Sequence, residues 1–232
     1  MPNEMIHRLP ASIDTVVFDL DGTLIESEPD LRAALNRLLQ DMGRRAVSRD
    51  EVVMMIGDGV PKLVERGLMA TSDDDIEDLE GHVARFLTYY EAAPTDLSEA
   101  FPGAHELLEA LKAAGAKIGV CTNKPEAPSR NILRIFGLDG FVDAVVGGDT
   151  LDGIRKPDPR HLAAVIERLG SDPARAVMVG DNANDIGTAR ALGVPAVAVS
   201  FGYPRGPVAD LKADAVIDQF EELWDVLASF AS

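Results

Sequence analysis

The amino-acid sequence predicts an α/β fold in which a Rossmann-like parallel sheet is flanked by helices and interrupted by an inserted all-helical cap domain. Two observations predict the sheet: short apolar runs recur along the chain, and stretches with helical spacing of apolar residues separate them. A third observation predicts the insertion, since a long interval after the first run contains helical stretches and no convincing strand.

The expected strands begin with Thr15–Phe18, a run of β-branched and aromatic residues that ends at Asp19. Further apolar runs follow at residues 117–121, 142–146, 176–179 and 195–199. Strands that alternate with helices form parallel sheets, and such sheets place their functional residues at the carboxyl ends of the strands. The residues directly after each run are therefore the first candidates for a functional site.

The domain organisation follows from the same pattern. We expect an α/β core formed by residues 1–25 and 102–232, and a helical cap formed by residues 26–101. Pro29 near the entry and Pro102-Gly103 near the exit suit hinge linkers. Within the cap, Ser72 is a plausible N-cap for a helix that begins in the acidic run 73–80.

Composition narrows the possible partners. The 39 acidic residues outnumber the 22 basic ones and leave a net charge of -17, which would repel nucleic-acid phosphates and anionic lipid headgroups. No apolar run approaches the ~20 residues of a membrane span. The single Cys121 cannot form an intrachain disulfide, and residues 1–10 contain no apolar signal segment, so a cytoplasmic location is expected. The expected partner is a small molecule; the oligomeric state is left open.

Two pairs of carboxylates follow expected strands. Asp19 and Asp21 lie in Asp19-Leu20-Asp21-Gly22-Thr23, and Asp181 and Asp185 would share one face of a helix that begins after residue 180. Two charges 4 Å apart repel by about 4 kcal/mol at an effective dielectric of 20, so such a cluster requires a cation or shared protons. Oxygen ligands without His or Cys favour Mg²⁺, whereas the glycine spacing of a calcium-binding EF-hand loop is lacking.

Polar residues also follow other strands. Thr122 and Asn123 come after the second run and offer a hydroxyl, an amide and backbone N–H groups to an anion. Lys156 lies in Arg155-Lys156-Pro157-Asp158-Pro159, where the prolines restrict the backbone. Together with a magnesium site, these groups predict a site for a phosphoryl group.

In this order, the motifs resemble the haloacid dehalogenase superfamily over nearly the whole chain. The resemblance rests on the motif around Asp19, on Thr122-Asn123, on Lys156-Pro157 and on Gly180-Asp181-x-x-x-Asp185. Within the superfamily, four further motifs are similar to those of phosphoglycolate phosphatases: Ile56-Gly57-Asp58-Gly59, Thr122-Asn123-Lys124-Pro125, Gly147-Gly148-Asp149-Thr150 and Ser200-Phe201-Gly202-Tyr203.

The resemblance implies a role for each carboxylate. Asp19 would be the nucleophile that forms an aspartyl phosphate, and Asp21 would be the general acid and base. Mg²⁺ would be held by the Asp19 carboxylate, the Asp21 backbone carbonyl and Asp181, with Asp185 supporting them from behind.

The resemblance also implies a phosphoryl-binding set of Thr122, the Asn123 amide and Lys156. The expected substrate is 2-phosphoglycolate. A phosphatase or phosphomutase for another small metabolite such as a sugar phosphate stays open, as does a non-catalytic binding module on the same fold. In the cap, Lys62 and Arg66 are as compatible with substrate contact as with surface charge.

Overall fold

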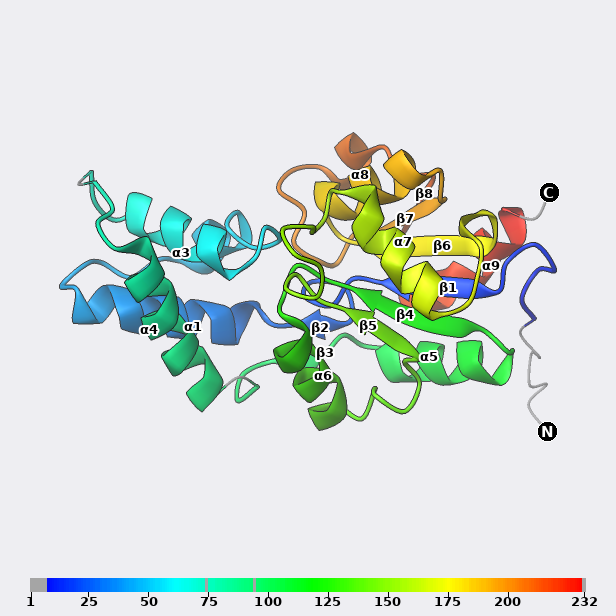
Figure 1. Ribbon diagram of the computed structural model, residues 1–232, viewed down its shortest axis with the longest axis horizontal. Coiled ribbons are helices and arrows are strands. Elements are labelled where there is room, and N and C mark those ends of the chain that lie inside the picture. Colours follow the sequence, from blue (N-terminus) through cyan, green and yellow to red (C-terminus); the bar gives the residue numbers. More distant parts are fainter. Residues whose placement is uncertain (1–7, 74, 94, 231–232) are drawn as a thin grey trace.

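The computed structural model describes residues 8–230 except residues 74 and 94, and it contains a six-stranded parallel sheet. The strand order is β5-β4-β1-β6-β7-β8 (Figure 1), so β1 lies in the interior of the sheet. The strands are β1 Thr15–Phe18, β4 Lys117–Cys121, β5 Ala144–Val146, β6 Ala176–Gly180, β7 Ala196–Val199 and β8 Ala215–Ile217. The predicted α/β fold class with a parallel sheet is confirmed.

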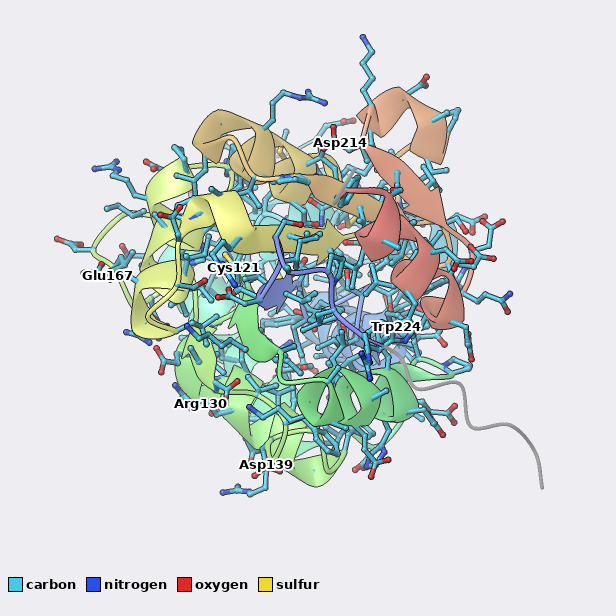
Figure 2. The ribbon with its side chains drawn as sticks, turned by 90° about the vertical axis from the view of Figure 1, so that its right-hand side faces the viewer. Cys121, Arg130, Asp139, Glu167, Asp214 and Trp224 are labelled. Carbon is cyan, nitrogen blue, oxygen red and sulfur yellow. The ribbon has the colours of Figure 1, made fainter. Side chains whose placement is uncertain are left out.

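Helices cover both faces of this sheet because successive residues of each strand point to opposite sides. On β1, Val16 and Phe18 pack with one apolar cluster and Val17 packs with another. Figure 2 shows the layers end-on, with α5 and α9 on one side and α7 and α8 on the other. The helices are α5 Ala104–Ala113, α6 Glu126–Ile135, α7 Pro159–Arg168, α8 Ala183–Leu192 and α9 Leu223–Ser229.

A group of four helices, the helical insertion, lies beside the sheet in Figure 1. These helices pack around an apolar cluster of their own that includes Leu35, Leu68 and Phe86. The packing is close, because a Cβ at Gly67 of α3 would lie 2.7 Å from the Leu35 side chain of α1. The four helices are α1 Glu28–Asp41, α2 Arg49–Val53, α3 Val60–Met69 and α4 Leu79–Ala92.

The entry and exit of the helical insertion form a short antiparallel ribbon. Strand β2, Ile25–Glu26, pairs with β3, Glu99–Ala100, with Ile25 opposite Ala100. The sequence analysis expected no strand in this interval, and these two-residue strands are too short to give a periodic signal. Within the described residues, no helix is both long and apolar enough to cross a membrane.

The predicted helix start at Ser72 is wrong. Helix α4 begins at Leu79, and the Asp78 side chain caps it by accepting a hydrogen bond of 3.0 Å from Gly81 N. The buried residues of this helix, Phe86 and Tyr90, lie later in the chain. The acidic stretch before Leu79 has little apolar surface to bury, so tertiary packing does not support a helix there.

Candidate active site

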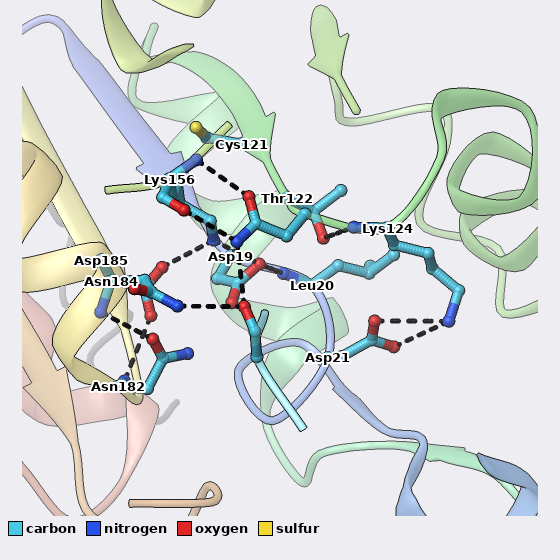
Figure 3. Close-up of polar contacts among 12 residues, drawn as sticks. Asp19, Leu20, Asp21, Cys121, Thr122, Lys124, Lys156, Asn182, Asn184 and Asp185 are labelled. Carbon is cyan, nitrogen blue, oxygen red and sulfur yellow. Dashed lines mark hydrogen bonds and ion pairs between the residues drawn. The ribbon is translucent and has the colours of Figure 1, made fainter. Parts of the chain in front are cut away.

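The predicted site residues meet at the carboxyl edge of the sheet. Asp19 follows β1, Thr122 follows β4 and Asp181 follows β6, and Figure 3 shows how side chains from these segments converge. A cleft opens between this edge and the helical insertion. It is lined by Asp19, Asp21, Leu31, Ile56, Gly57, Gly59, Val60, Leu63, Thr122, Asn123 and Lys124.

Asp19 is 4% exposed and sits beside a buried lysine. Its Oδ1 lies 2.8 Å from Lys156 Nζ and accepts a hydrogen bond of 2.7 Å from Leu20 N. Burial raises the pKa of Asp19 well above its ordinary value, and the nearby Asp185 carboxylate adds to this, although Lys156 opposes it. Lys156 is therefore the local group that favours the ionised form of Asp19.

Asp19, Asp181 and Asp185 form a buried carboxylate cluster whose ligand atoms lie within 4.8 Å of one another. Burial, and next the Asp185 charge, raise the pKa of Asp181 to about 7. A divalent cation would relieve this repulsion, and oxygen-only donors suit a hard cation. The donor set therefore fits Mg²⁺.

Asp185 supports the cluster rather than facing outward from it. Its Oδ2 accepts hydrogen bonds of 3.1 Å from both Asp181 N and Asn182 N at the start of α8, and its Oδ1 lies 2.6 Å from Lys156 Nζ. Both carboxylate oxygens are thus engaged in holding the loop after β6 and the lysine. The supporting role that the resemblance implies for Asp185 stays a prediction.

Asp181 is held by close backbone packing. Its Oδ2 accepts a hydrogen bond of 2.8 Å from Tyr203 N, in the loop after β7. Gly22 has a φ of +85°, and a Cβ there would lie 2.3 Å from Asp181 Oδ2. The glycine of the Asp19 motif is therefore required both for its left-handed backbone and for the space that Asp181 occupies.

Lys156 and Asn123 hold the two loops of the site together. Asn123 Oδ1 accepts a hydrogen bond of 2.9 Å from Lys156 N, and Asn123 Nδ2 donates to Lys156 O at 3.0 Å. The same Nδ2 donates to Gly57 O of the helical insertion at 2.9 Å. The Asn123 side chain is thus occupied by backbone contacts.

Lys124 belongs to the motif Thr122-Asn123-Lys124-Pro125 but was not predicted as a site residue. Lys124 is 6% exposed, and its Nζ lies 3.1 and 3.3 Å from the two carboxylate oxygens of Asp21 (Figure 3). It also donates a hydrogen bond of 2.9 Å to the Tyr90 hydroxyl of α4. Burial opposes its charge, yet Asp21 and Tyr90 together raise the pKa of Lys124 above its ordinary value. A lysine three residues after the end of a buried strand is the signal that could have identified it.

The loop at Gly57-Asp58-Gly59, within the helical insertion, contacts the core through Asp58. Asp58 accepts a hydrogen bond of 2.6 Å from Asn184 Nδ2 and forms ion pairs of 2.6 Å with Arg205 and 2.5 Å with Arg66. Arg66 is thus bound to Asp58, and the exposed Lys62 pairs with Glu65 at 2.5 Å. Neither Lys62 nor Arg66 is among the residues that line the cleft.

Comparison with known proteins places this fold and site in a family. A family model for haloacid dehalogenase-like hydrolases matches residues 13–193, and the chain belongs to this family. The predicted resemblance is confirmed. Phosphatases of this family generally use Mg²⁺, and the carboxylate cluster has the chemistry to bind a metal ion.

Its relatives define a narrower group. The chain is 46% identical over 217 residues to a phosphoglycolate phosphatase from Rhodospirillum rubrum, a match that covers 91% of this chain and 90% of the relative. It is also 46% identical to a phosphoglycolate phosphatase from Caulobacter vibrioides, with 89% and 87% covered. A solved structure from Haemophilus somnus, described as a predicted phosphoglycolate phosphatase, superimposes with a TM-score of 0.88 at 31% identity, covering 93% of this chain and 98% of that one. These relatives support phosphatase activity.

Proposed function

We propose that the chain is a Mg²⁺-dependent phosphomonoesterase that hydrolyses 2-phosphoglycolate to glycolate and phosphate. The observation that carries the proposal is the single cleft in which Asp19, Asp21 and Thr122 face a shared space, with Lys156 beside Asp19. The names of the similar proteins supply the choice of substrate. The catalytic, phosphoryl-binding and metal-binding roles below are part of this proposal.

Asp19, Asp181 and the Asp21 backbone carbonyl would hold Mg²⁺, and Asp185 would orient Asp181 and Lys156 through its hydrogen bonds. When bound, the ion supplies positive charge that offsets the carboxylates and polarises the phosphoryl oxygens. Lys156 and the Thr122 hydroxyl contribute further stabilisation of phosphoryl charge. These groups are fixed before substrate arrives, which is the condition for effective electrostatic stabilisation.

In the first step, a carboxylate oxygen of Asp19 attacks phosphorus as the bond to the ester oxygen breaks, and Asp21 gives its proton to the leaving alkoxide. Glycolate and an aspartyl phosphate result. In the second step, Asp21 takes a proton from a water molecule that attacks phosphorus. The bond between phosphorus and the Asp19 oxygen then breaks, which releases phosphate and restores both carboxyl groups.

The helical insertion completes the cleft. We propose that residues 26–101 act as a cap on a core of residues 1–25 and 102–232. Leu31, Ile56 and Leu63 are apolar cleft residues from this part of the chain, and they would exclude water from the reacting groups. A cleft lined from both the core and the insertion suits a small metabolite rather than a phosphoprotein.

A panel of phosphate esters tests the proposal. Phosphate release is measured with Mg²⁺ and with EDTA for 2-phosphoglycolate, ethyl phosphate and several sugar phosphates. We expect the highest kcat/KM for 2-phosphoglycolate and loss of activity in EDTA. A higher kcat/KM for a sugar phosphate would contradict the choice of 2-phosphoglycolate as substrate. An isomerised product without phosphate release would indicate a mutase. Inactivity on every ester would contradict phosphatase function.

A further inference from the structure

We infer that the Lys124 ammonium binds the carboxylate of the substrate, and that the Tyr90 hydroxyl positions it from the helical insertion. This inference rests on the proposed function, because it concerns the organic part of a phosphate ester in the same cleft. The ligand class is a short phosphoester that carries a carboxylate on the carbon next to the ester linkage.

The charge of the cleft lining singles out Lys124. Among the described residues that line it, Lys124 is the one cation, while Asp19 and Asp21 are anionic and the residues from the helical insertion are apolar or glycine. Lys156 is committed to Asp19 and Asp185, at the phosphoryl end. A substrate with a second anionic group therefore meets one lysine at the other end.

Lys124 has hydrogen-bonding capacity to spare. An ammonium group has three N–H donors, and the acceptors of Lys124 Nζ are the Asp21 carboxylate and the Tyr90 hydroxyl. Its distances of 3.1 and 3.3 Å to Asp21 exceed the 2.7–2.9 Å typical of strong charge-assisted hydrogen bonds. A single N–H shared between the two Asp21 oxygens can make both long contacts, and the third donor can then bind an incoming carboxylate.

Tyr90 holds the ammonium in place. Its side chain is buried, its ring stacks on Phe86 with a centroid distance of 6.0 Å, and Lys124 Nζ lies 4.7 Å from its ring centroid. The hydroxyl accepts a hydrogen bond from Lys124 and so keeps its own O–H to donate. Because Tyr90 comes from α4 and Lys124 from the core, this subsite is complete only when the two parts are in contact.

The position of Lys124 also matches the size of the substrate. Asp21 must lie beside the ester oxygen in order to protonate it, and Lys124 is 3.1 Å from Asp21. In 2-phosphoglycolate the carboxylate carbon is two bonds from that oxygen, so the carboxylate would reach the same neighbourhood. A sugar phosphate offers a neutral group there, beside the apolar side chains of Leu31 and Leu63.

The test compares Lys124→Met with Lys62→Met, a matched loss of charge on an exposed lysine. Values of kcat/KM are measured for 2-phosphoglycolate and for ethyl phosphate, which lacks the carboxylate. Loss of one hydrogen bond to a charged group predicts that Lys124→Met lowers the preference for 2-phosphoglycolate over ethyl phosphate by about 10- to 150-fold. Lys62→Met should leave it unchanged. Lys124→Arg should restore part of the preference, and Tyr90→Phe should reduce it through a higher KM.

Binding measurements separate this inference from catalysis. Calorimetric titration of 2-phosphoglycolate and ethyl phosphate is carried out on Asp19→Asn protein with Mg²⁺, with and without Lys124→Met. Selective loss of 2-phosphoglycolate affinity supports the subsite even if no turnover is found. If Lys124→Met weakens both ligands or both reactions equally, Lys124 acts only through Asp21 and the carboxylate subsite is overturned, while phosphatase activity of the parent would stand.

Discussion

The two sides of the cleft differ in the kind of residue that they supply. The core side provides the charged groups, namely Asp19, Asp21 and Lys124 in the lining and the buried Lys156 behind them. The side formed by the helical insertion provides apolar residues such as Leu31 and Leu63. Its charged residue Asp58 is directed into contacts with Asn184 and Arg205 instead.

This difference separates two requirements of catalysis. Bond making and proton transfer need charges at fixed positions, and the core supplies them from loops anchored on buried strands. Exclusion of water needs a surface that encloses the ligand, which we propose the insertion supplies, whereas the choice of substrate would be shared between Lys124 of the core and Tyr90 of the insertion. Changes at Asp19 and Asp21 should therefore alter the chemistry, whereas changes at Lys124 and on the insertion side should alter binding and closure.

The largest effect is expected for Asp19→Asn. An amide keeps the shape of the side chain but is a poor nucleophile, so kcat should fall on the order of a thousandfold or more. Phosphate release from 2-phosphoglycolate measures this, with far-UV circular dichroism to show that the fold is retained. Activity within tenfold of the parent would contradict the nucleophile assignment.

Asp21→Asn should produce a loss that depends on the leaving group. General acid–base catalysis contributes about 10²- to 10⁴-fold, so hydrolysis of ethyl phosphate should fall by that order. Formation of the aspartyl phosphate from p-nitrophenyl phosphate, whose leaving group needs no proton, should fall much less in a pre-steady-state burst. Equal losses for both substrates would argue against proton donation by Asp21.

Mg²⁺ should stabilise the protein through the core alone. At 100 times its Kd the ion contributes about 2.7 kcal/mol to the free energy of unfolding, which a thermal shift in Tm measures. Asp181→Asn should abolish the shift, whereas Asp58→Ala, on the insertion side, should leave it intact. A shift that Asp58→Ala removes would contradict the division between the two sides.

The same shift should depend on pH. Between about pH 4 and 7 the folded protein retains a proton on Asp181 that the unfolded chain releases, because the folded pKa is about 7 against 3.8. The contribution of this group to stability in the absence of metal therefore falls as pH rises through that range. Because Mg²⁺ must displace this proton, the increase in Tm caused by Mg²⁺ should be larger at pH 8 than at pH 6. An equal shift at both values would contradict this raised pKa.

The smallest effect is expected for Asp58→Ala, which removes contacts between the insertion and the core residues Asn184 and Arg205. The side chain is partly exposed, so kcat/KM should fall by only about tenfold, through a lower population of the closed arrangement. Unlike Lys124→Met, this change should affect 2-phosphoglycolate and ethyl phosphate alike. The exposed Asp139→Ala serves as control, and a loss confined to 2-phosphoglycolate would show that Asp58 acts on the substrate.

Apart from Lys124, the sequence was sufficient to predict the charged groups on the core side of the cleft. Buried parallel strands produce strong apolar runs, and a polar residue after each run must lie at one sheet edge, which is how Asp19, Thr122 and Asp181 could be placed together. Strand β8 was not predicted. It is short and its Val216 is exposed, so the sequence contains only a weak apolar run there.

The insertion side was harder to predict because its contacts join residues far apart in the chain. Nothing local to Asn123 indicates that its amide binds Gly57, and nothing local to Lys124 indicates Tyr90. Arg66 and Lys62 have equivalent sequence surroundings, yet one is bound to Asp58 and the other is exposed. Tertiary packing decides which of the two cations is free to contact a ligand. The spacing of hydrophobic residues in the sequence does not reveal this packing.

The ribbon between β2 and β3 limits how the helical insertion can move. Besides the strand pairing, Phe101 N donates to Leu24 O at 3.0 Å, and Asp30 at the start of α1 accepts hydrogen bonds from Leu97 N at 3.1 Å and Ser98 Oγ at 2.5 Å. The two segments that connect the insertion to the core are thus bound to each other. Two separate tethers would let the insertion twist and slide, whereas two tethers bound to each other would leave chiefly a swing about a common axis. Any opening would then return Tyr90 along the same path toward Lys124.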